Sequence, residues 1–183
     1  MKRQVCAGAA LAAAACLGAA ACGGGTDAPG GSPRQTTAQP PSAEPAPGPF
    51  LGLCGSVTDG ELSATTGIPQ PMHVVRDPVG CQWDVGELGE GAHASFTWYR
   101  GSPIGRERAI DNAVGRDVRD VTIEGAPGFS SRYRSTLCEV GVQYGDDFFL
   151  WSIDYGAGAA RPPHGDVCDA AQELATMTAE RAQ

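Results

Sequence analysis

The first 22 residues decide which part of this chain folds and in which compartment it does so. Lys2 and Arg3 form a short cationic segment, residues 5–15 are apolar, and small residues lead into Cys22. This order is typical of a secretory signal peptide, and its apolar segment is too short to span a bilayer as a helix. We therefore expect residues 1–21 to be removed as a lipoprotein signal peptide, so that the rest of the chain folds outside the cytoplasm.

Cys22 is the candidate site of lipid attachment. It ends the stretch Leu-Gly-Ala-Ala-Ala-Cys, which resembles a bacterial lipobox, although Ala19 stands where a lipobox has a larger aliphatic residue. In such a signal the thiol takes a diacylglycerol, and the cysteine becomes the first residue of the mature chain. The alternative is an ordinary A-x-A cleavage site at 19–21, which would give a secreted protein. We favour lipidation because an exposed, unpaired thiol is otherwise unusual in an exported protein.

Residues 22–49 are predicted to be a tether. After Cys22 they are mostly Gly, Pro, Ser, Thr, Ala and Gln, with almost no apolar bulk, and therefore cannot bury enough surface to fold. As a flexible coil the segment would span about 30 Å. Residues 50–183 remain as a single extracytoplasmic domain, which is large enough for its own hydrophobic core.

The charge balance limits the partners of this domain. The signal peptide holds two of the 13 cations and none of the 21 acids, so the mature chain has 11 cations and 21 acids, a formal charge of −10. Nucleic-acid binding needs a basic face, so we expect no nucleic-acid partner. The same acidity opposes electrostatic docking on anionic lipid, so the acyl chains would supply the membrane affinity.

Four cysteines lie in the predicted domain, at 54, 81, 138 and 168, and an even number in an exported domain indicates two disulfides. Three pairings are open. Loop-closure entropy does not decide among them, because each local loop is worth roughly 3.5 kcal/mol and the crossed loops only about 1 more. We predict Cys54–Cys81 and Cys138–Cys168, because neighbours in the sequence can pair without a long-range search.

Capping signals predict three helices. Thr58 and Glu61 form a capping box at the start of a helix over 59–66. Ser102, followed by proline, is expected to cap a second helix that ends at Gly115 and carries a modest apolar stripe of Ile104, Ile110, Ala113 and Val114. Asp166 is expected to cap a last helix over 167–181, with an apolar residue at every third or fourth position.

Alternating apolar and polar residues predict the strands. The expected ranges are 73–75, 80–85, 94–100, 120–124, 129–134, 137–144 and 148–155. The strands within 119–155 are too close together for parallel crossovers, which need a dozen or more residues. We therefore predict an α+β fold in which an antiparallel sheet of five to seven strands packs with three helices. By analogy, the Mog1/PsbP sandwich is the most similar known architecture.

Five short motifs follow one another along the chain in a characteristic order. They are Leu-Cys-Gly at 53–55, Thr-x-Gly-Glu-Leu at 58–62, Gly-Cys-Gln-Trp at 80–83, Leu-Cys-Glu-Val at 137–140 and Val-Cys-Asp-Ala-Ala at 167–171. Together they resemble the actinobacterial lipoproteins grouped as domain of unknown function 3558. The resemblance implies an exported, tethered helix–sheet–helix domain. It implies no catalytic residues.

Motifs of common catalytic sites are missing. The sequence has no G-x-S-x-G, P-loop or H-E-x-x-H motif. Its three histidines are His73, His93 and His164, and they lie apart from the cysteines. We interpret them as surface or strand-edge residues, and we therefore predict no metal and no cofactor. Asp146 and Asp147 read as solvated acids of a hairpin turn.

Two classes of function remain. The first is a non-enzymatic binding or sensing module on the outer face of the cytoplasmic membrane, and the alternative is a cell-envelope enzyme. The missing motifs favour the first. Its partner would be an envelope ligand or a membrane protein that is neutral, cationic or apolar. Trp98, Tyr99, Trp151 and Tyr155 are the candidate contact residues, although aromatic residues in strands are more often part of the core.

Overall fold

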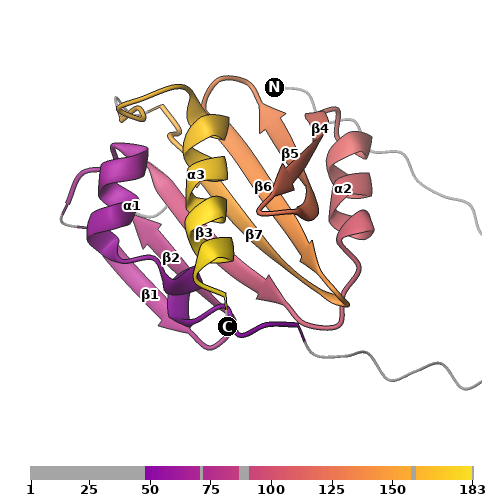
Figure 1. Ribbon diagram of the computed structural model, residues 1–183. Helices are drawn as coiled ribbons and strands as arrows, with labels where there is room; N and C mark the ends of the chain where they lie inside the picture. The colour runs from indigo at the N-terminus through magenta and orange to yellow at the C-terminus, as the bar shows by residue number, and fades with distance from the viewer. Residues whose placement is uncertain (1–47, 71, 87–90, 158–159, 183) are drawn as a thin grey trace, which may run out of the picture. The chain divides into compact units, whose positions relative to one another are not determined.

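The computed structural model describes residues 48–182, except 71, 87–90 and 158–159. The predicted signal peptide, Cys22 and the predicted tether up to residue 47 lie outside the described residues. The elements of the described part (Figure 1) are η1 (a 3-10 helix, Leu53–Ser56), α1 (Asp59–Thr66), β1 (His73–Asp77), β2 (Gly80–Asp84), β3 (His93–Tyr99), α2 (Ile104–Ala113), β4 (Asp117–Ile123), β5 (Ala126–Tyr133), β6 (Leu137–Tyr144), β7 (Asp147–Asp154) and α3 (Val167–Glu180). None of these helices is long and apolar enough to cross a membrane.

All seven described strands form one antiparallel sheet, in the order β1-β2-β3-β7-β6-β5-β4. β1 to β3 make one meander and β4 to β7 make another, and the two meet where β3 pairs with β7. α2 connects the two meanders. The predicted α+β class, with an antiparallel sheet and three helices, is confirmed.

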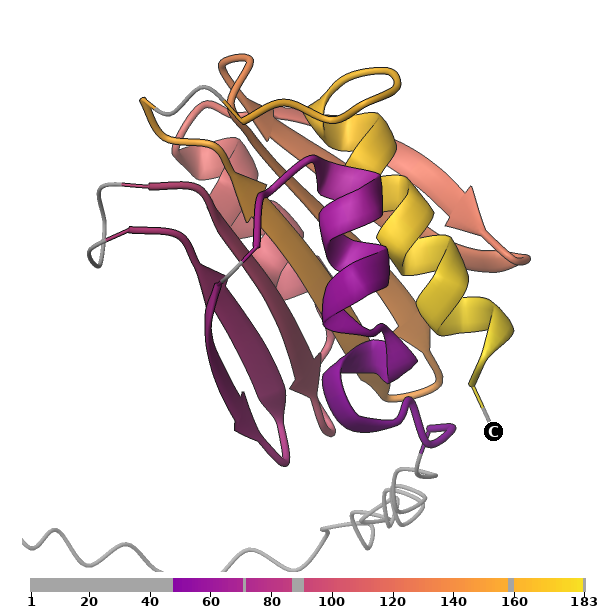
Figure 2. The same cartoon turned by 90° about the vertical axis from the view of Figure 1, so that its left-hand side faces the viewer.

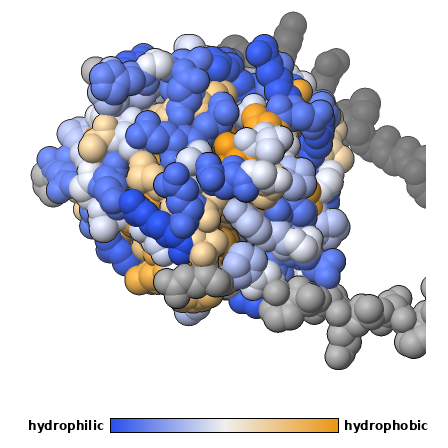
Figure 3. All heavy atoms as spheres, in the orientation of Figure 1, coloured by the Kyte–Doolittle hydropathy of each residue, from blue (hydrophilic) through white to orange (hydrophobic). Residues whose placement is uncertain are grey.

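The two faces of this sheet are covered unequally. α1 and α3 lie side by side on one face, while α2 lies on the other (Figure 2). α2 packs against β4, β5 and β6, so it covers only one half of its face. The outer side of the α1 and α3 layer is largely hydrophilic (Figure 3), as expected of a helix layer that meets solvent.

The apolar core lies between the sheet and the layer of α1 and α3. Trp83 stacks on Trp151 with ring centroids 5.6 Å apart, and Phe96 packs against Trp151 at 5.3 Å. The indole Nε1 of Trp151 donates a hydrogen bond of 3.0 Å to Oγ1 of Thr178 in α3. This bond satisfies the one polar atom that the buried ring carries.

Both predicted disulfides form. Cys54–Cys81 joins η1 to β2, and Cys138–Cys168 joins β6 to the first turn of α3. Each bridge therefore ties one segment of the helix layer to the sheet. Sequence separations of 27 and 30 residues give both loops the local character that the prediction assumed.

The predicted caps of the first and last helices also form. The side chain of Thr58 accepts a hydrogen bond from the Glu61 N–H, and the Glu61 carboxylate accepts one from the Thr58 N–H. Asp166 and Asp169 make the same reciprocal pair at the start of α3. α1 spans the predicted residues, and α3 ends one residue before its predicted end.

The predicted cap of α2 is wrong, and the apolar stripe of this helix lies largely in solvent. Pro103, not Ser102, occupies the N-cap, and it makes no side-chain cap bond. The apolar stripe is not buried, because Ile110 is 46% exposed and Val114 is 62% exposed, whereas Asp111 is the buried residue of this helix. The physical reason is that ion pairs, described below, attract the polar side of α2 to the sheet.

The turn between β4 and β5 is shorter than predicted. Residues 126–128 were expected to form a loop, yet they pair with 121–123 of β4. The connection consists of Glu124 and Gly125 alone, with φ angles of 47° and 80°. Two consecutive left-handed residues form the tight hairpin turn whose twist matches that of the flanking strands.

Candidate functional site

The uncovered half of the sheet is the candidate site. We call it the open half-face, meaning the side of β1, β2, β3 and β7 that points away from α1 and α3. Strand register and the two-residue alternation of side chains define its members. They are His73, Val75, Gln82, Asp84, His93, Ser95, Thr97, Leu150, Ser152 and Asp154. All are exposed or half-buried, and most are polar, unlike the apolar residues on the opposite side of the same strands.

Four ionisable residues form one row across this half-face. His73 is the register partner of Asp84, Asp84 of His93, and His93 of Asp154. Nδ1 of His93 lies 2.8 Å from Oδ1 of Asp84, whose side chain is only 12% exposed. When Nδ1 donates to this carboxylate, Nε2 of the neutral ring is an acceptor. Asp84 thus fixes the orientation of the imidazole.

A cavity of about 240 Å³ lies at this row. Its walls are Asp84, Val85, Gly91, Ala92, His93, Asp154 and Gly156. A Cβ at Gly91 would lie 1.6 Å from the carbonyl oxygen of Val85, so only glycine fits this wall. The described residues that line the cavity supply two carboxylates and an imidazole, and none of them is Arg or Lys. Its size and charge suit a small cationic group or a donor of hydrogen bonds.

The row does not make a catalytic triad or a metal site. Ser95 and Ser152 lie in the next row of the half-face and are register partners of each other. Among the described residues, no hydrogen bond joins His93 to a serine. The described part likewise contains no group of three or more His, Cys, Asp or Glu side chains placed to hold a metal ion. The arrangement supports polar recognition more directly than nucleophilic chemistry.

A polar cluster lies at the edge of the open half-face, next to the part of the sheet that α2 covers. Arg116 Nη1 lies 3.1 Å from Oδ1 of Asp111 in α2 and also binds the Glu139 carboxylate of β6. Ser152 donates a hydrogen bond of 3.3 Å to Glu139 from the open side. Burial raises the pKa of Glu139, and Arg116 opposes that rise. The hydroxyl of Ser131, opposite Glu139 in the register, is buried without a partner among the described residues.

The predicted contact residues are mostly core residues. Trp151 and Tyr155 are fully buried, so the prediction that they contact a ligand is wrong. Both side chains point into the helix layer, where the Tyr155 hydroxyl donates a 2.6 Å hydrogen bond to the carbonyl of Thr66. Trp98 is only 8% exposed. Tyr99 alone keeps a partly exposed ring, which stacks on Phe148 with centroids 4.3 Å apart.

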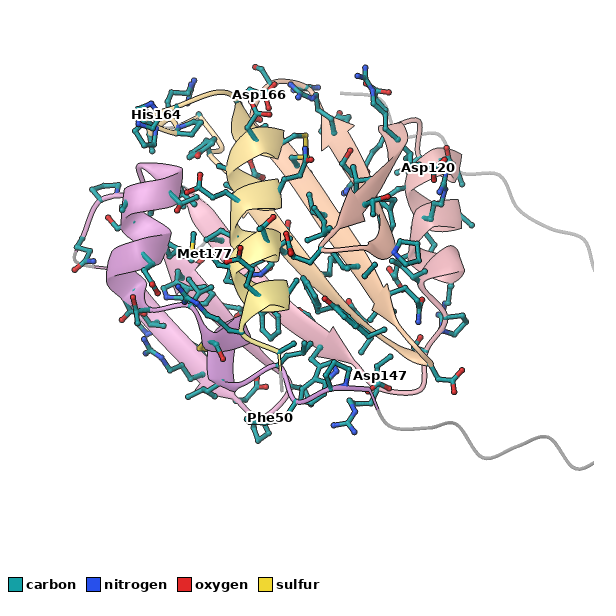
Figure 4. The ribbon with its side chains drawn as sticks, in the orientation of Figure 1. Phe50, Asp120, Asp147, His164, Asp166 and Met177 are labelled. Carbon is teal, nitrogen blue, oxygen red and sulfur yellow. A yellow bond between two sulfur atoms is a disulfide. The ribbon has the colours of Figure 1, made fainter. Side chains whose placement is uncertain are left out.

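Asp147 also differs from its prediction, because it is a buried residue instead of a solvated turn acid. Its carboxylate accepts hydrogen bonds from the N–H groups of Gly48 (3.1 Å) and Gly101 (2.8 Å). Arg100 Nε lies 2.9 Å from the same carboxylate. Figure 4 labels this residue at the lower margin of the domain, beside the first described residues. Asp147 therefore joins the start of the domain to the loop that precedes α2.

A second cavity, of about 320 Å³, lies on the other face between α3 and strands β4 and β5. Both of its arginines already pair with lining carboxylates. Arg119 binds Asp117 at 2.8 Å, and Arg132 binds Asp166 at 2.6 Å. Asp166 also caps α3. Since these groups satisfy one another, this cavity offers a ligand less uncommitted charge than the row at His93.

Comparisons with known proteins agree on one family. A family model described as "Protein of unknown function (DUF3558)" matches residues 17–181. A Mycobacterium bovis protein named "Putative lipoprotein LprB" is 40% identical over 140 residues, which cover 74% of each chain. The proteins of the same name from Mycobacterium tuberculosis and Mycobacterium leprae are 39% and 37% identical, with 74–75% of each chain covered. No solved structure matches the chain, so the likeness to the Mog1/PsbP sandwich stays a prediction.

Proposed function

This chain belongs to the DUF3558 family, and we propose that it is a membrane-anchored, extracytoplasmic binding module whose ligand lies on the open half-face. The single observation that carries the binding role is the unequal covering of the sheet. α1 and α3 cover the core of one face, while α2 leaves half of the other face open and lined with polar side chains. Antiparallel sheets often leave one face in solvent, and here that face also carries the cavity lined by Asp84, His93 and Asp154.

The lipid anchor follows from the family and from the first residues of the chain. The relatives carry the name lipoprotein, and the matched range includes Cys22. We propose that Cys22 bears the acyl chains and that the domain lies at the outer face of the cytoplasmic membrane. Release as a secreted protein is the alternative. Detergent-phase partitioning of the wild type and of Cys22→Ala separates the two, since only a lipidated chain enters the detergent phase through this residue.

The charges of the site select the ligand. The cavity places Asp84 and Asp154 beside His93, and the mature chain carries a formal charge of −10. Both features repel phosphate and carboxylate groups and attract an amine. Beyond the cavity, Gln82, Ser95 and other hydroxyl or amide side chains offer neutral donors and acceptors. The ligand that fits is therefore small, polar and cationic at one end.

An envelope enzyme is the second class, and it is less well supported. His93 has an orienting carboxylate in Asp84, as a general base needs, but no nucleophile lies within hydrogen-bond reach of it among the described residues. We propose that the domain performs no catalysis. Turnover of an envelope substrate by the purified protein, abolished by His93→Ala, would contradict this.

Three sugars of equal ring size test the binding role. We suggest titrating the ¹⁵N-labelled mature chain carrying Cys22→Ala with glucosamine, N-acetylglucosamine and glucuronate. Glucosamine should shift the amide resonances of Asp84, His93 and Asp154 most, the neutral sugar less and the anionic sugar least. His93→Ala should reduce the shifts, whereas His164→Ala, an exposed histidine outside the half-face, should not. Shifts caused by glucuronate alone, or shifts scattered away from the half-face, would overturn the proposal.

A further inference from the structure

We infer that the end of the domain formed by Phe50, Leu53 and Val79 rests in the headgroup layer of the membrane that holds the anchor. The inference rests on the lipid anchor of the proposed function and adds an orientation to it. We call these three residues the apolar end. Their exposed fractions are 59%, 58% and 54%, values that a core residue never has. A cluster of exposed apolar side chains on a small domain usually marks an interaction surface.

Ring, backbone and disulfide links connect the neighbourhoods of all three residues to Trp98. Phe50 packs edge-on against Trp98 with ring centroids 6.1 Å apart. The N–H of Trp98 donates a 2.7 Å hydrogen bond to the carbonyl of Val79. Leu53 precedes Cys54, whose disulfide leads to Cys81, two residues after Val79. Hydrophobic surface appears along the lower margin of the domain in Figure 3, where Figure 4 labels Phe50.

The backbone presents these side chains in a fixed way. Leu51 is fully buried, while Phe50 and Leu53 on either side of it point outward. The hydroxyl of Ser56 donates a 3.1 Å hydrogen bond to the carbonyl of Leu51, and Gly48 is bound by Asp147. Phe50 and Leu53 are therefore exposed on a segment that hydrogen bonds hold in place at both ends.

The position of the apolar end identifies the bilayer as its occupant. The part of the chain that leads to Cys22 joins the domain at Gly48, which is two residues before Phe50. Cys22 precedes Gly48 by 26 residues, the segment for which the sequence predicts a tether that would span about 30 Å. With Cys22 held in the membrane, this end is the part of the domain that meets the surface first.

The chemistry around the apolar end suits the headgroup layer. The Arg100 guanidinium lies 4.2 Å from the centre of the Trp98 ring and is half exposed. Aromatic rings and Arg side chains with a polar tip and an apolar body favour the boundary between water and lipid. The acidity of the whole chain opposes attraction to anionic lipid, so the contact would depend on insertion of apolar side chains and not on charge.

This orientation places the candidate site away from the membrane. His93 begins β3, and Trp98 lies five residues later, near the end of the strand. At about 3.3 Å per residue, the row at His93 lies about 17 Å further from the bilayer than the ring of Trp98. The cavity would thus open toward ligands that arrive from outside.

Hydrogen exchange of the full lipidated protein in nanodiscs tests the inference. We suggest nanodiscs of phosphatidylcholine with phosphatidylglycerol, compared with the soluble Cys22→Ala chain. Amides of residues 50–54 and 79–81 should exchange at least about three times more slowly in nanodiscs than in solution. Phe50→Ser with Leu53→Ser and Val79→Ser should abolish the slowing. Ile110→Ser with Val114→Ser, which alters apolar residues of α2 that are exposed to a similar extent, should preserve the slowing.

The outcomes separate this inference from the anchor. A chain that stays out of the nanodiscs overturns the anchor and this inference with it. A chain that enters them while the apolar end exchanges at the same rate as in solution overturns this inference alone. Circular dichroism shows whether the triple variant folds. If it does not, the wild type can be tested by NMR in nanodiscs that contain lipids with spin-labelled headgroups. The spin labels should broaden the resonances of residues 50–54 and 79–81 first, and uniform broadening would refute the contact.

Discussion

The carboxylate of Asp147 accepts a hydrogen bond of 3.1 Å from the backbone N–H of Gly48, 99 residues earlier in the chain. The same side chain accepts a second bond from Gly101, so one buried acid joins three distant segments. The contact therefore holds Gly48, the first described residue, against the β6–β7 hairpin.

We expect Asp147→Ala to lower the free energy of unfolding by about 2–4 kcal/mol, because it leaves two backbone donors and the Arg100 side chain without their acceptor. Asp146→Ala is the matched control, since Asp146 is an exposed neighbour on the same hairpin. The control should change the free energy of unfolding by less than about 0.5 kcal/mol. Urea denaturation of both variants measures the difference, and equal effects would contradict the bonding role of Asp147.

Removal of the Cys138–Cys168 bridge, as the double alanine variant, should lower the free energy of unfolding by about 2–5 kcal/mol. The bridge holds the first turn of α3 on β6. Its loss removes a constraint from the unfolded chain and so raises the conformational entropy of the unfolded state. Thermal denaturation monitored by circular dichroism checks the loss. Peptide mapping without reductant should recover the two local pairs, and a peptide joining Cys54 to Cys168 would refute the connectivity.

Glu61 should make stability depend on pH. The hydrogen bond from Arg181, together with bonds from Thr58, lowers the pKa of Glu61 from its ordinary 4.5 to about 2. A carboxyl whose pKa is lower in the folded state stabilises the fold above pH 4.5, and this contribution is lost between about pH 4.5 and 2. Solvent screens the exposed pair, so we expect less than about 1 kcal/mol. Glu61→Gln should be less stable than wild type at pH 7 and equal to it at pH 2.

Two glycines should respond in opposite directions to substitution by alanine. Gly105 lies inside α2, and a Cβ added there would meet no atom within 4 Å, so Gly105→Ala should raise the free energy of unfolding by about 0.5–1 kcal/mol. At Gly128 of β5 the new Cβ would lie 2.2 Å from the carbonyl oxygen of Gly141. Gly128→Ala should therefore destabilise the protein by about 1–3 kcal/mol. Chemical denaturation checks both signs.

The sequence predicts the local features of this fold well, for a physical reason. Caps such as Thr58 with Glu61 act over three residues, so their pattern is complete in a short stretch. α2 shows the limit of such reasoning. Its apolar residues suggest an inward stripe, but Arg116, which lies outside the helix, draws Asp111 to the sheet and leaves Ile110 in solvent.

The candidate site is less predictable because no segment contains it. Asp84, His93 and Asp154 come from three strands, and only the register of two strand pairs brings them together. A shift of one residue in either pair would turn one of them to the opposite face. The prediction that aromatic residues contact a ligand was wrong for a related reason. Trp151 and Tyr155 occupy alternate positions that face the helix layer, and nothing local to them states which face is covered.

Asp154 gives the sharpest test of the charge at the site. Asp84 is engaged by His93, whereas Asp154 lies on the other side of the imidazole in the same row. We expect Asp154→Asn to weaken glucosamine binding by about 3- to 10-fold, because the side chain keeps its size and loses its attraction for the amine. Asp120→Asn removes the same charge from an exposed position on β4, so it should leave the affinity nearly unchanged. The difference between the variants, measured by NMR titration, should shrink at high salt, which screens such interactions. Equal weakening by both would show that the net charge of the domain, and not the row at His93, attracts the amine.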